Sequence, residues 1–208
     1  MEKLSDQFIS HAKASRVHGI FLLADLDAFA GSLSKNVLEF LIENDLCRQA
    51  VEDLYTLTKP VNGVPGRRVS SANTTDVVLY RSHLQGEIVT LHGMEDLYRL
   101  GFMSQMPVQP AYWTNGVGEV INVFGRSVKI SSVPKEWLAN HSEPEGKLLR
   151  ALVILNREPT SVELVEALKR LRVSPEDYKQ KLDWLCQQEC LPSEVRRAIQ
   201  TAQDEKLT

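Results

Sequence analysis

Asp25 and Asp27 are carboxylates close enough in sequence to suggest acid–base catalysis. Residues 24–30 are predicted to form a short helix, and residues two apart on a helix point away from each other. We therefore expect Asp25 to cap this helix, and we expect neither aspartate to be catalytic.

The histidines and cysteines do not form a metal-binding pattern. The five histidines are scattered, and none stands at ligand spacing from Cys, Asp or Glu. Cys186 and Cys190 would share a helix face, but no further zinc ligand follows at motif spacing. The chain also lacks a Gly-x-Ser-x-Gly elbow, a glycine-rich phosphate loop and a His-Glu-x-x-His motif. We expect no catalytic residue, metal or cofactor.

Tyr112 and Trp113 could offer a stacking platform for a nucleic-acid base. They lie in a predicted strand, where neighbouring side chains point to opposite faces, so at most one of them would be exposed. A core role is favoured, and stacking by one ring stays as an alternative.

Basic residues indicate a different chemistry, the binding of phosphate. Lys35, Arg48, Arg67 and Arg68 could line a phosphate-facing surface of the N-terminal region. Acidic residues lie on the same predicted elements, and they are Glu39, Glu43, Asp45, Glu52 and Asp53. Because Glu52 and Asp53 would repel a nucleic-acid backbone, contact with DNA and contact with protein both remain open.

The C-terminal part also carries many basic residues, among them Arg150, but acidic residues alternate with them. Such mixed charge is typical of a solvated helix face. It could also form the docking surface of a charged partner.

The N-terminal elements have the order of a winged helix-turn-helix. An amphipathic first helix precedes the short helix, a second helix is predicted over 34–44, and two short strands over 46–58 turn near 51–53. In this motif the second helix enters the major groove of DNA. Its exposed early residues would include Ser34, Lys35 and Asn36, and the wing would carry Arg48.

The Pro- and Gly-rich stretch 59–68 is predicted to link two domains. Domain 1 would be the winged helix over 1–68, and domain 2 would cover 69–208. Within domain 2 we expect a small mixed α/β region over about 87–131 and helices over about 134–205. The predicted fold class is α+β.

Composition places few limits on function. The chain has 208 residues, 43% of them hydrophobic and 25% charged, with a formal net charge of −3. This balance argues against a generally basic nucleic-acid coat protein but allows a local basic face. No signal peptide or membrane-spanning segment is visible, so we expect a cytoplasmic protein without a membrane partner.

Several motifs together resemble a known family. Leu97-Tyr-Arg-Leu-Gly-Phe-Met-Ser-Gln-Met-Pro107 precedes Tyr112-Trp-Thr-Asn-Gly116 and a short hairpin ending in Arg126-Ser-Val-Lys-Ile130. With the predicted winged helix before them and helices after them, these segments resemble the AbiEi-type antitoxins of bacterial type IV toxin–antitoxin systems. The likeness extends over nearly the whole chain. The stretch Leu46–Tyr55 departs from the pattern, because acids stand where the family has arginine and glycine.

The resemblance implies an antitoxin-like transcriptional regulator. Its winged helix would bind double-stranded operator DNA and repress its own operon, and its C-terminal domain would counteract a nucleotidyltransferase-like toxin. The implied DNA-binding residues are Ser34, Lys35, Asn36, Arg48, Arg67 and Arg68.

Two other functions remain as hypotheses. The chain could be a protein-interaction module whose degenerate winged helix does not bind specific DNA, which the acidic wing favours. It could also be an enzyme acting on nucleic acid with a site assembled from distant residues, although we expect it not to be an enzyme.

Overall fold

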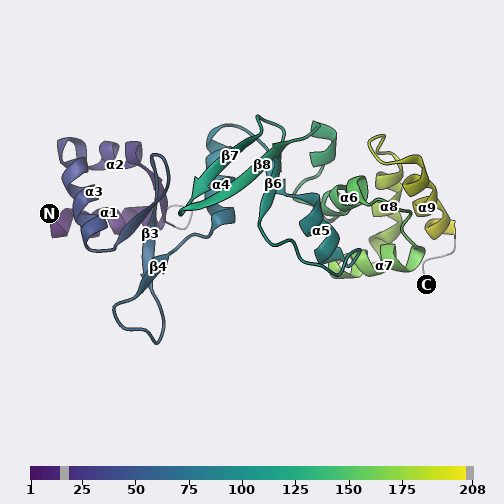
Figure 1. Ribbon diagram of the computed structural model, residues 1–208, viewed down its shortest axis with the longest axis horizontal. Helices are drawn as coiled ribbons and strands as arrows, with labels where there is room; N and C mark the ends of the chain where they lie inside the picture. Colours follow the sequence, from purple (N-terminus) through teal and green to yellow (C-terminus); the bar gives the residue numbers. More distant parts are fainter. Residues whose placement is uncertain (15–18, 205–208) are drawn as a thin grey trace. The chain divides into compact units, whose positions relative to one another are not determined.

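The chain folds into two compact units, each described here by itself. The computed structural model describes residues 1–14 and 19–204. The first unit comprises Met1–Gly86 with Val120–Ser127, and the second comprises Glu87–Glu119 with Val128–Thr208. The sequence predicted a boundary at residue 68. The compact units divide after Gly86 instead. Helices and strands occur in both units, which confirms the α+β class (Figure 1).

The first unit is built around a sheet in which β3 is central. Its helical elements are α1 (Glu2–Ala14), α2 (Leu23–Ala30), the 3-10 helix η1 (Gly31–Leu33), α3 (Ser34–Glu43) and α4 (Thr74–Leu84). Its main strands are β1 (Ile20–Leu22), β2 (Cys47–Val51), β3 (Leu54–Pro60) and β4 (Arg68–Ser70). β3 pairs antiparallel with β1, β2 and β4.

One face of this sheet packs against α1, α2 and α3. The shared cluster of buried side chains comprises Phe8, Ala12, Phe21, Leu26, Val37, Leu41, Cys47, Tyr55 and Leu57. Alternate residues of a strand point to opposite faces, so Tyr55 and Leu57 face the helices while Thr56 and Thr58 face the other side. Each large apolar side chain in this cluster contributes about 1.5–3 kcal/mol. The cluster therefore holds α3 firmly against the sheet.

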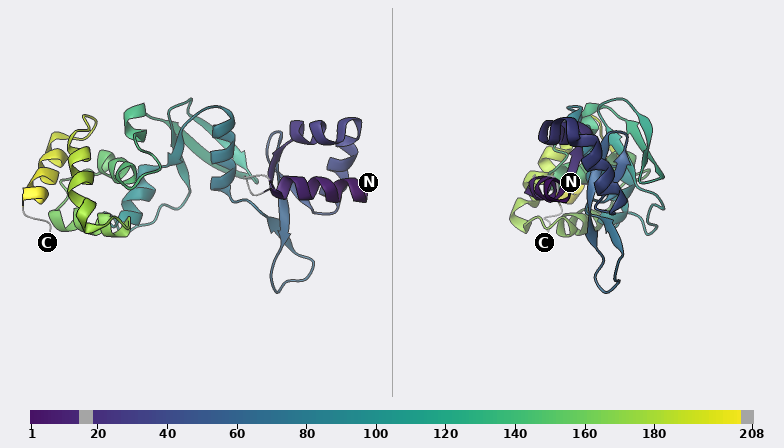
Figure 2. Two further views of the ribbon diagram at one scale, coloured as in Figure 1. Left: turned by 180° about the vertical axis from the view of Figure 1, so that it is seen from behind. Right: turned by 90° about the vertical axis from the view of Figure 1, so that its left-hand side faces the viewer.

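β2 and β3 form the hairpin that the sequence predicted, with Glu52 and Asp53 between the two strands. β3 then continues past β2 into a second hairpin, here called the arm and comprising Thr58–Ser70, in which Thr58 pairs with Ser70 and Pro60 with Arg68. The arm extends away from α1–α3 and ends in a loop (Figures 1 and 2). The prediction of an interdomain linker over 59–68 was wrong, since its glycines close turns between paired strands.

The second sheet has the strand order β5-β6-β8-β7. Its strands are β5 (Val89–Leu91), β6 (Ala111–Thr114), β7 (Glu119–Val123) and β8 (Arg126–Ser132), with β6 antiparallel to β5 and parallel to β8. The predicted β7–β8 hairpin is confirmed, with its turn at Phe124 and Gly125. Both have the positive φ angles that a type I′ turn requires, 51° and 80°. The tip of this hairpin belongs to the first unit, where the Phe124 N–H donates to the Ala50 carbonyl at 3.0 Å.

The helical part of the second unit encloses the larger apolar core. Its elements are α5 (Gly93–Leu100), η2 (Lys135–Leu138), α6 (Pro144–Ile154), α7 (Ser161–Arg170), η3 (Pro175–Asp177), α8 (Tyr178–Cys186) and α9 (Ser193–Asp204). Arg150, on α6, was predicted to lie on a solvated helix face. That prediction was wrong, because its side chain is 3% exposed and pairs with Asp96. Within residues 1–14 and 19–204, no helix has the length and apolar character needed to span a membrane.

Candidate nucleic-acid interface

The residues first considered for catalysis have structural roles or no shared site. An Asp25 carboxylate oxygen accepts the Leu22 N–H at 2.8 Å and so caps α2, as the sequence predicted. His92 Nδ1 accepts the Met94 N–H at the start of α5. In the part of the chain that the structure describes, no three His, Cys, Asp or Glu side chains gather in a way that could hold a metal ion.

The cysteine thiols stay protonated at neutral pH. Burial, assisted by the Asp45 carboxylate, raises the pKa of Cys47 to about 12. Burial also raises the pKa of Cys186 and of Cys190. Because the thiolate is the nucleophilic and metal-binding form, none of these thiols is poised for either role.

The proposed stacking platform at Tyr112 and Trp113 does not exist. Their exposures are 0% and 3%, so β6 is covered on both faces. Trp113 packs against Trp137 and His92, with ring centroids 5.3 Å and 4.7 Å away. The aromatic pair is therefore part of the core, which was the favoured interpretation.

The first turn of α3 presents two of its three candidate DNA-binding residues. Lys35 and Asn36 are exposed, and their side chains make no hydrogen bond or ion pair with the residues that the structure describes. Ser34 is only 5% exposed and lies where η1 passes into α3. We therefore remove Ser34 from the candidate interface and retain Lys35 and Asn36.

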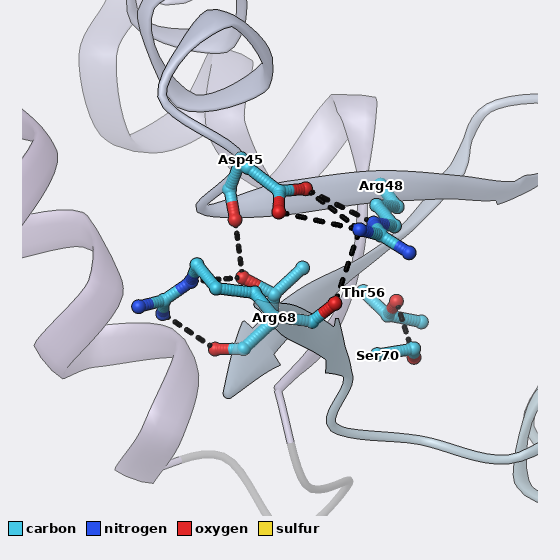
Figure 3. A network of polar contacts seen from close by, with 6 residues as sticks. Asp45, Arg48, Thr56, Arg68 and Ser70 are labelled. Carbon is cyan, nitrogen blue, oxygen red and sulfur yellow. Dashed lines mark hydrogen bonds and ion pairs between the residues drawn. The ribbon is translucent and has the colours of Figure 1, made fainter. Parts of the chain in front are cut away.

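Arg48 and Arg68 meet in a polar network where the arm leaves the sheet (Figure 3). Arg48 Nε and Nη2 both lie 3.0 Å from an Asp45 carboxylate oxygen, and Nη2 also donates to the Arg68 carbonyl at 3.1 Å. Arg68 Nε donates to the Thr58 hydroxyl at 2.8 Å, and that hydroxyl donates to the Asp45 carbonyl. The network ties the end of α3 to β2, β3 and β4.

A second polar contact supports the same region of the sheet. The Thr56 and Ser70 hydroxyls lie 2.8 Å apart, and Figure 3 shows this contact beside the network. Thr56 points away from α1, α2 and α3. Asp45, which anchors the network, has a positive φ of 52°. Asp tolerates this left-handed conformation better than most residues, which explains an aspartate at the point where α3 ends and β2 begins.

The network borders an open hollow of about 520 Å³. Its lining comprises Asp45, Arg48, Pro65, Gly66, Arg67, Arg68 and Val69. Among these lining residues, three guanidinium groups face one carboxylate, which leaves a formal charge of 3 − 1 = +2. The Arg67 guanidinium makes no contact with a polar partner among the described residues. The hollow thus combines positive charge with unused donors, which is the chemistry that binds phosphate.

The acidic turn of the β2–β3 hairpin lies at the opposite end of β3. Asp53 and Pro60 are separated by the length of the strand, about 23 Å at 3.3 Å per residue. Charges on the surface are largely screened beyond about 8–10 Å at physiological salt. Glu52 and Asp53 therefore do not cancel the positive charge at the arm, although the sequence suggested that they would repel DNA from the same surface.

Sequence reasoning identified the arginines but missed their partners and the arm. The missed residues are Asp45, Thr56, Thr58 and Ser70. A usable signal existed, since Asn62-Gly63 and Pro65-Gly66 are hairpin-turn dipeptides between residues that can extend. Comparisons with protein families, with curated proteins and with solved structures found no match to this chain.

Proposed function

We propose that this protein is a DNA-binding transcriptional regulator of the antitoxin type and that its first unit is a winged helix-turn-helix. The observation that carries the proposal is the cluster of Arg48, Arg67 and Arg68 around one hollow at the end of the sheet. A positive, hydrogen-bond-donating surface beside an exposed helix is what double-stranded DNA requires of a protein.

The arrangement of elements supports the winged-helix assignment. The order α1-β1-α2-α3-β2-β3, with an antiparallel sheet β1-β3-β2 packed on α1–α3, is consistent with the element order expected of the motif. In this arrangement α3 is the recognition helix, and recognition helices contact base edges through their N-terminal residues. Lys35 and Asn36 hold those positions and have free side chains among the described residues.

The contacts divide between base edges and phosphates. Lysine donates to guanine, and the amide of asparagine suits adenine, so Lys35 and Asn36 can discriminate bases. Arg48, Arg67 and Arg68 supply charge, which fixes the position of the protein on the duplex but carries little sequence information. Arg48 shares its charge with Asp45, so Arg67 and Arg68 contribute most of the attraction to phosphate.

Removing the base contacts is expected to reduce sequence discrimination. The quantity to compare is the affinity for the DNA upstream of the reading frame divided by the affinity for a shuffled duplex. In the double variant Lys35→Ala, Asn36→Ala this ratio should be about 10–100-fold lower than in the unchanged chain, because each good base contact contributes about 1–3 kcal/mol. Fluorescence anisotropy at a fixed moderate salt concentration measures the ratio. The folded state should persist, since both side chains are exposed.

Lys13→Ala is the matched control, because Lys13 is an exposed cation on α1, outside the proposed interface. It should leave the preference unchanged. If the unchanged chain shows no preference for its upstream DNA, the regulator proposal fails, and the protein-interaction module becomes the better account.

The antitoxin part of the proposal rests on the resemblance of Leu97–Pro107 and the segments after it to the AbiEi-type family. It assigns to the second unit the neutralisation of a nucleotidyltransferase-like toxin. Co-expression with such a protein from the adjacent reading frame should restore growth that the toxin alone arrests. The Lys35→Ala, Asn36→Ala variant should restore growth equally, because it alters only the first unit. Continued arrest with the unchanged chain would refute antitoxin activity.

A further inference from the structure

The tip of the arm is made of two consecutive turns. The Val64 N–H donates to the Val61 carbonyl at 3.2 Å, and the Arg67 N–H donates to the Val64 carbonyl at 3.3 Å. Each turn has a glycine at its third position, Gly63 and Gly66, with φ of 77° and 74°. Pro65 before Gly66 gives the sequence of a type II turn. The backbone of the loop thus follows two defined turns, each closed by one of its own hydrogen bonds.

The arm also has an unusual balance of side chains for an exposed hairpin. Between Lys59 and Arg68 there are three cations and no acidic residue. Two glycines leave the tip slim, and Val64, 43% exposed, gives it an apolar edge. A slim apolar edge flanked by cations can enter a narrow groove whose walls are sugars and whose rims are phosphates.

Arg67 is the cation of the arm that is free to enter such a groove. Arg68 is held by the Thr58 hydroxyl and carbonyl, at 2.8 Å and 3.0 Å. Arg67 is exposed beside the tip, its backbone is held by the Val61 N–H at 2.9 Å, and its guanidinium has no polar partner among the described residues. Its backbone is thus positioned while its charge remains available.

The place of the arm relative to α3 fits two adjacent grooves of one duplex. The arm leaves the sheet beside Asp45, just after α3 ends, whereas Lys35 and Asn36 lie at the start of α3. Ten helical residues span about 15 Å. The major and minor grooves on one side of B-DNA are about 17 Å apart, half of the 34 Å turn. The start of α3 and the base of the arm are therefore separated by a distance close to the spacing of neighbouring grooves.

We propose that the arm inserts into the minor groove of an A·T-rich segment beside the major-groove site of α3, with Arg67 as the inserted side chain. The inference rests on the proposed DNA-binding function. It adds that the arm binds the minor groove, that the contacted segment is A·T-rich and that Arg67 makes the contact. A·T tracts have a narrow minor groove with enhanced negative potential, which attracts arginine. Guanidinium is more weakly hydrated than ammonium, so arginine enters this groove more readily than lysine.

Two duplexes that share the upstream site and differ only in their flanks, A·T-rich or G·C-rich, test the proposal with the full chain. Fluorescence anisotropy should show about tenfold tighter binding to the duplex with the A·T-rich flank. A difference of this size is about what one mismatched base pair costs in a specific complex. Netropsin, which occupies the minor groove of A·T tracts, should abolish that difference. Arg67→Ala should also abolish it and should lower the slope of log affinity against log salt by about 0.9.

Arg67→Lys separates insertion from simple charge, because it retains the cation. It should keep the salt dependence but lose most of the preference for the A·T-rich flank. Equal affinity for both flanks, or a full preference in Arg67→Lys, overturns the minor-groove assignment while DNA binding stands. Binding to neither duplex overturns the DNA-binding function itself, and the arm proposal with it.

Discussion

Replacing Arg150 with alanine is expected to lower the free energy of unfolding of the second unit by about 3–5 kcal/mol. Arg150 Nε lies 2.7 Å from an Asp96 carboxylate oxygen, and the two side chains are only 3% and 6% exposed. Arg150 Nη1 also donates to the His141 carbonyl at 3.0 Å. Truncation would leave the buried Asp96 carboxylate without its donor, which costs far more than the loss of a surface pair. Urea denaturation followed by circular dichroism measures the change.

The pH dependence of this variant gives a second check. Burial raises the pKa of Asp96, and the Arg150 guanidinium opposes that rise. Without Arg150 the pKa should rise further above its value in the unfolded chain. A carboxyl with a raised folded-state pKa favours folding at low pH and disfavours it once pH exceeds the unfolded value. The stability deficit of Arg150→Ala should therefore shrink as pH falls toward 4.

Arg99→Ala is the matched control. It breaks an arginine–glutamate pair on α5, the helix that also carries Asp96. Arg99 Nε lies 2.8 Å from Glu95; the Arg99 side chain is 60% exposed and the Glu95 side chain is 14% exposed. Because the guanidinium keeps most of its contact with water, we expect this pair to contribute no more than about 1 kcal/mol. Equal destabilisation by the two alanine variants would contradict the assigned role of the Arg150–Asp96 pair.

Gly146→Ala should destabilise the same unit by about 3 kcal/mol, against the usual preference of helices for alanine. A Cβ atom at Gly146 would lie 2.0 Å from the Asn140 carbonyl oxygen and 2.7 Å from that of Ala139. The Asn140 carbonyl cannot easily move, since it accepts the Glu143 N–H at 2.8 Å. The gain of about 1 kcal/mol in helix propensity is therefore outweighed by the overlap with backbone atoms.

Lys147→Ala controls for helix propensity at the neighbouring position of α6. Lys147 is exposed, so its replacement should change the unfolding free energy by no more than about 0.5 kcal/mol. Thermal unfolding of the two variants and the unchanged chain gives the comparison. A Gly146→Ala protein that unfolds at the same temperature as the unchanged chain would show that the turn before α6 can relax.

Local sequence patterns predicted most of the helices and strands, because hydrophobic period and capping chemistry depend on near neighbours. Thr160 and Glu163, for example, form a capping box at the start of α7, and the Thr-x-x-Glu spacing that predicts it is local. The arm was missed because β4 has only three residues and its pairing with β3 spans the loop. Composition alone cannot distinguish the turns of a hairpin from a linker when the second strand is this short.

The candidate site was predictable in its charges and not in its geometry. Lys35, Asn36, Arg48, Arg67 and Arg68 were identified from residue type and predicted element. Ser34 directly follows a 3-10 turn of three residues, which is too short to have a hydrophobic period from which its burial could be predicted. Arg150 was assigned to the surface because its partner, Asp96, is 54 residues away in sequence, and such pairing has no local signature.

The continuity of β3 has a consequence for how this architecture can change over generations. Its first half, Leu54–Leu57, is locked into the helix-packed core, whereas its end carries the arm. Insertions or replacements within 62–66 would alter the reach of the tip without touching a residue of the core cluster. Residues 62–66 can therefore change without a loss of core packing. Such changes would alter what the arm contacts and leave the contacts of α3 as they are.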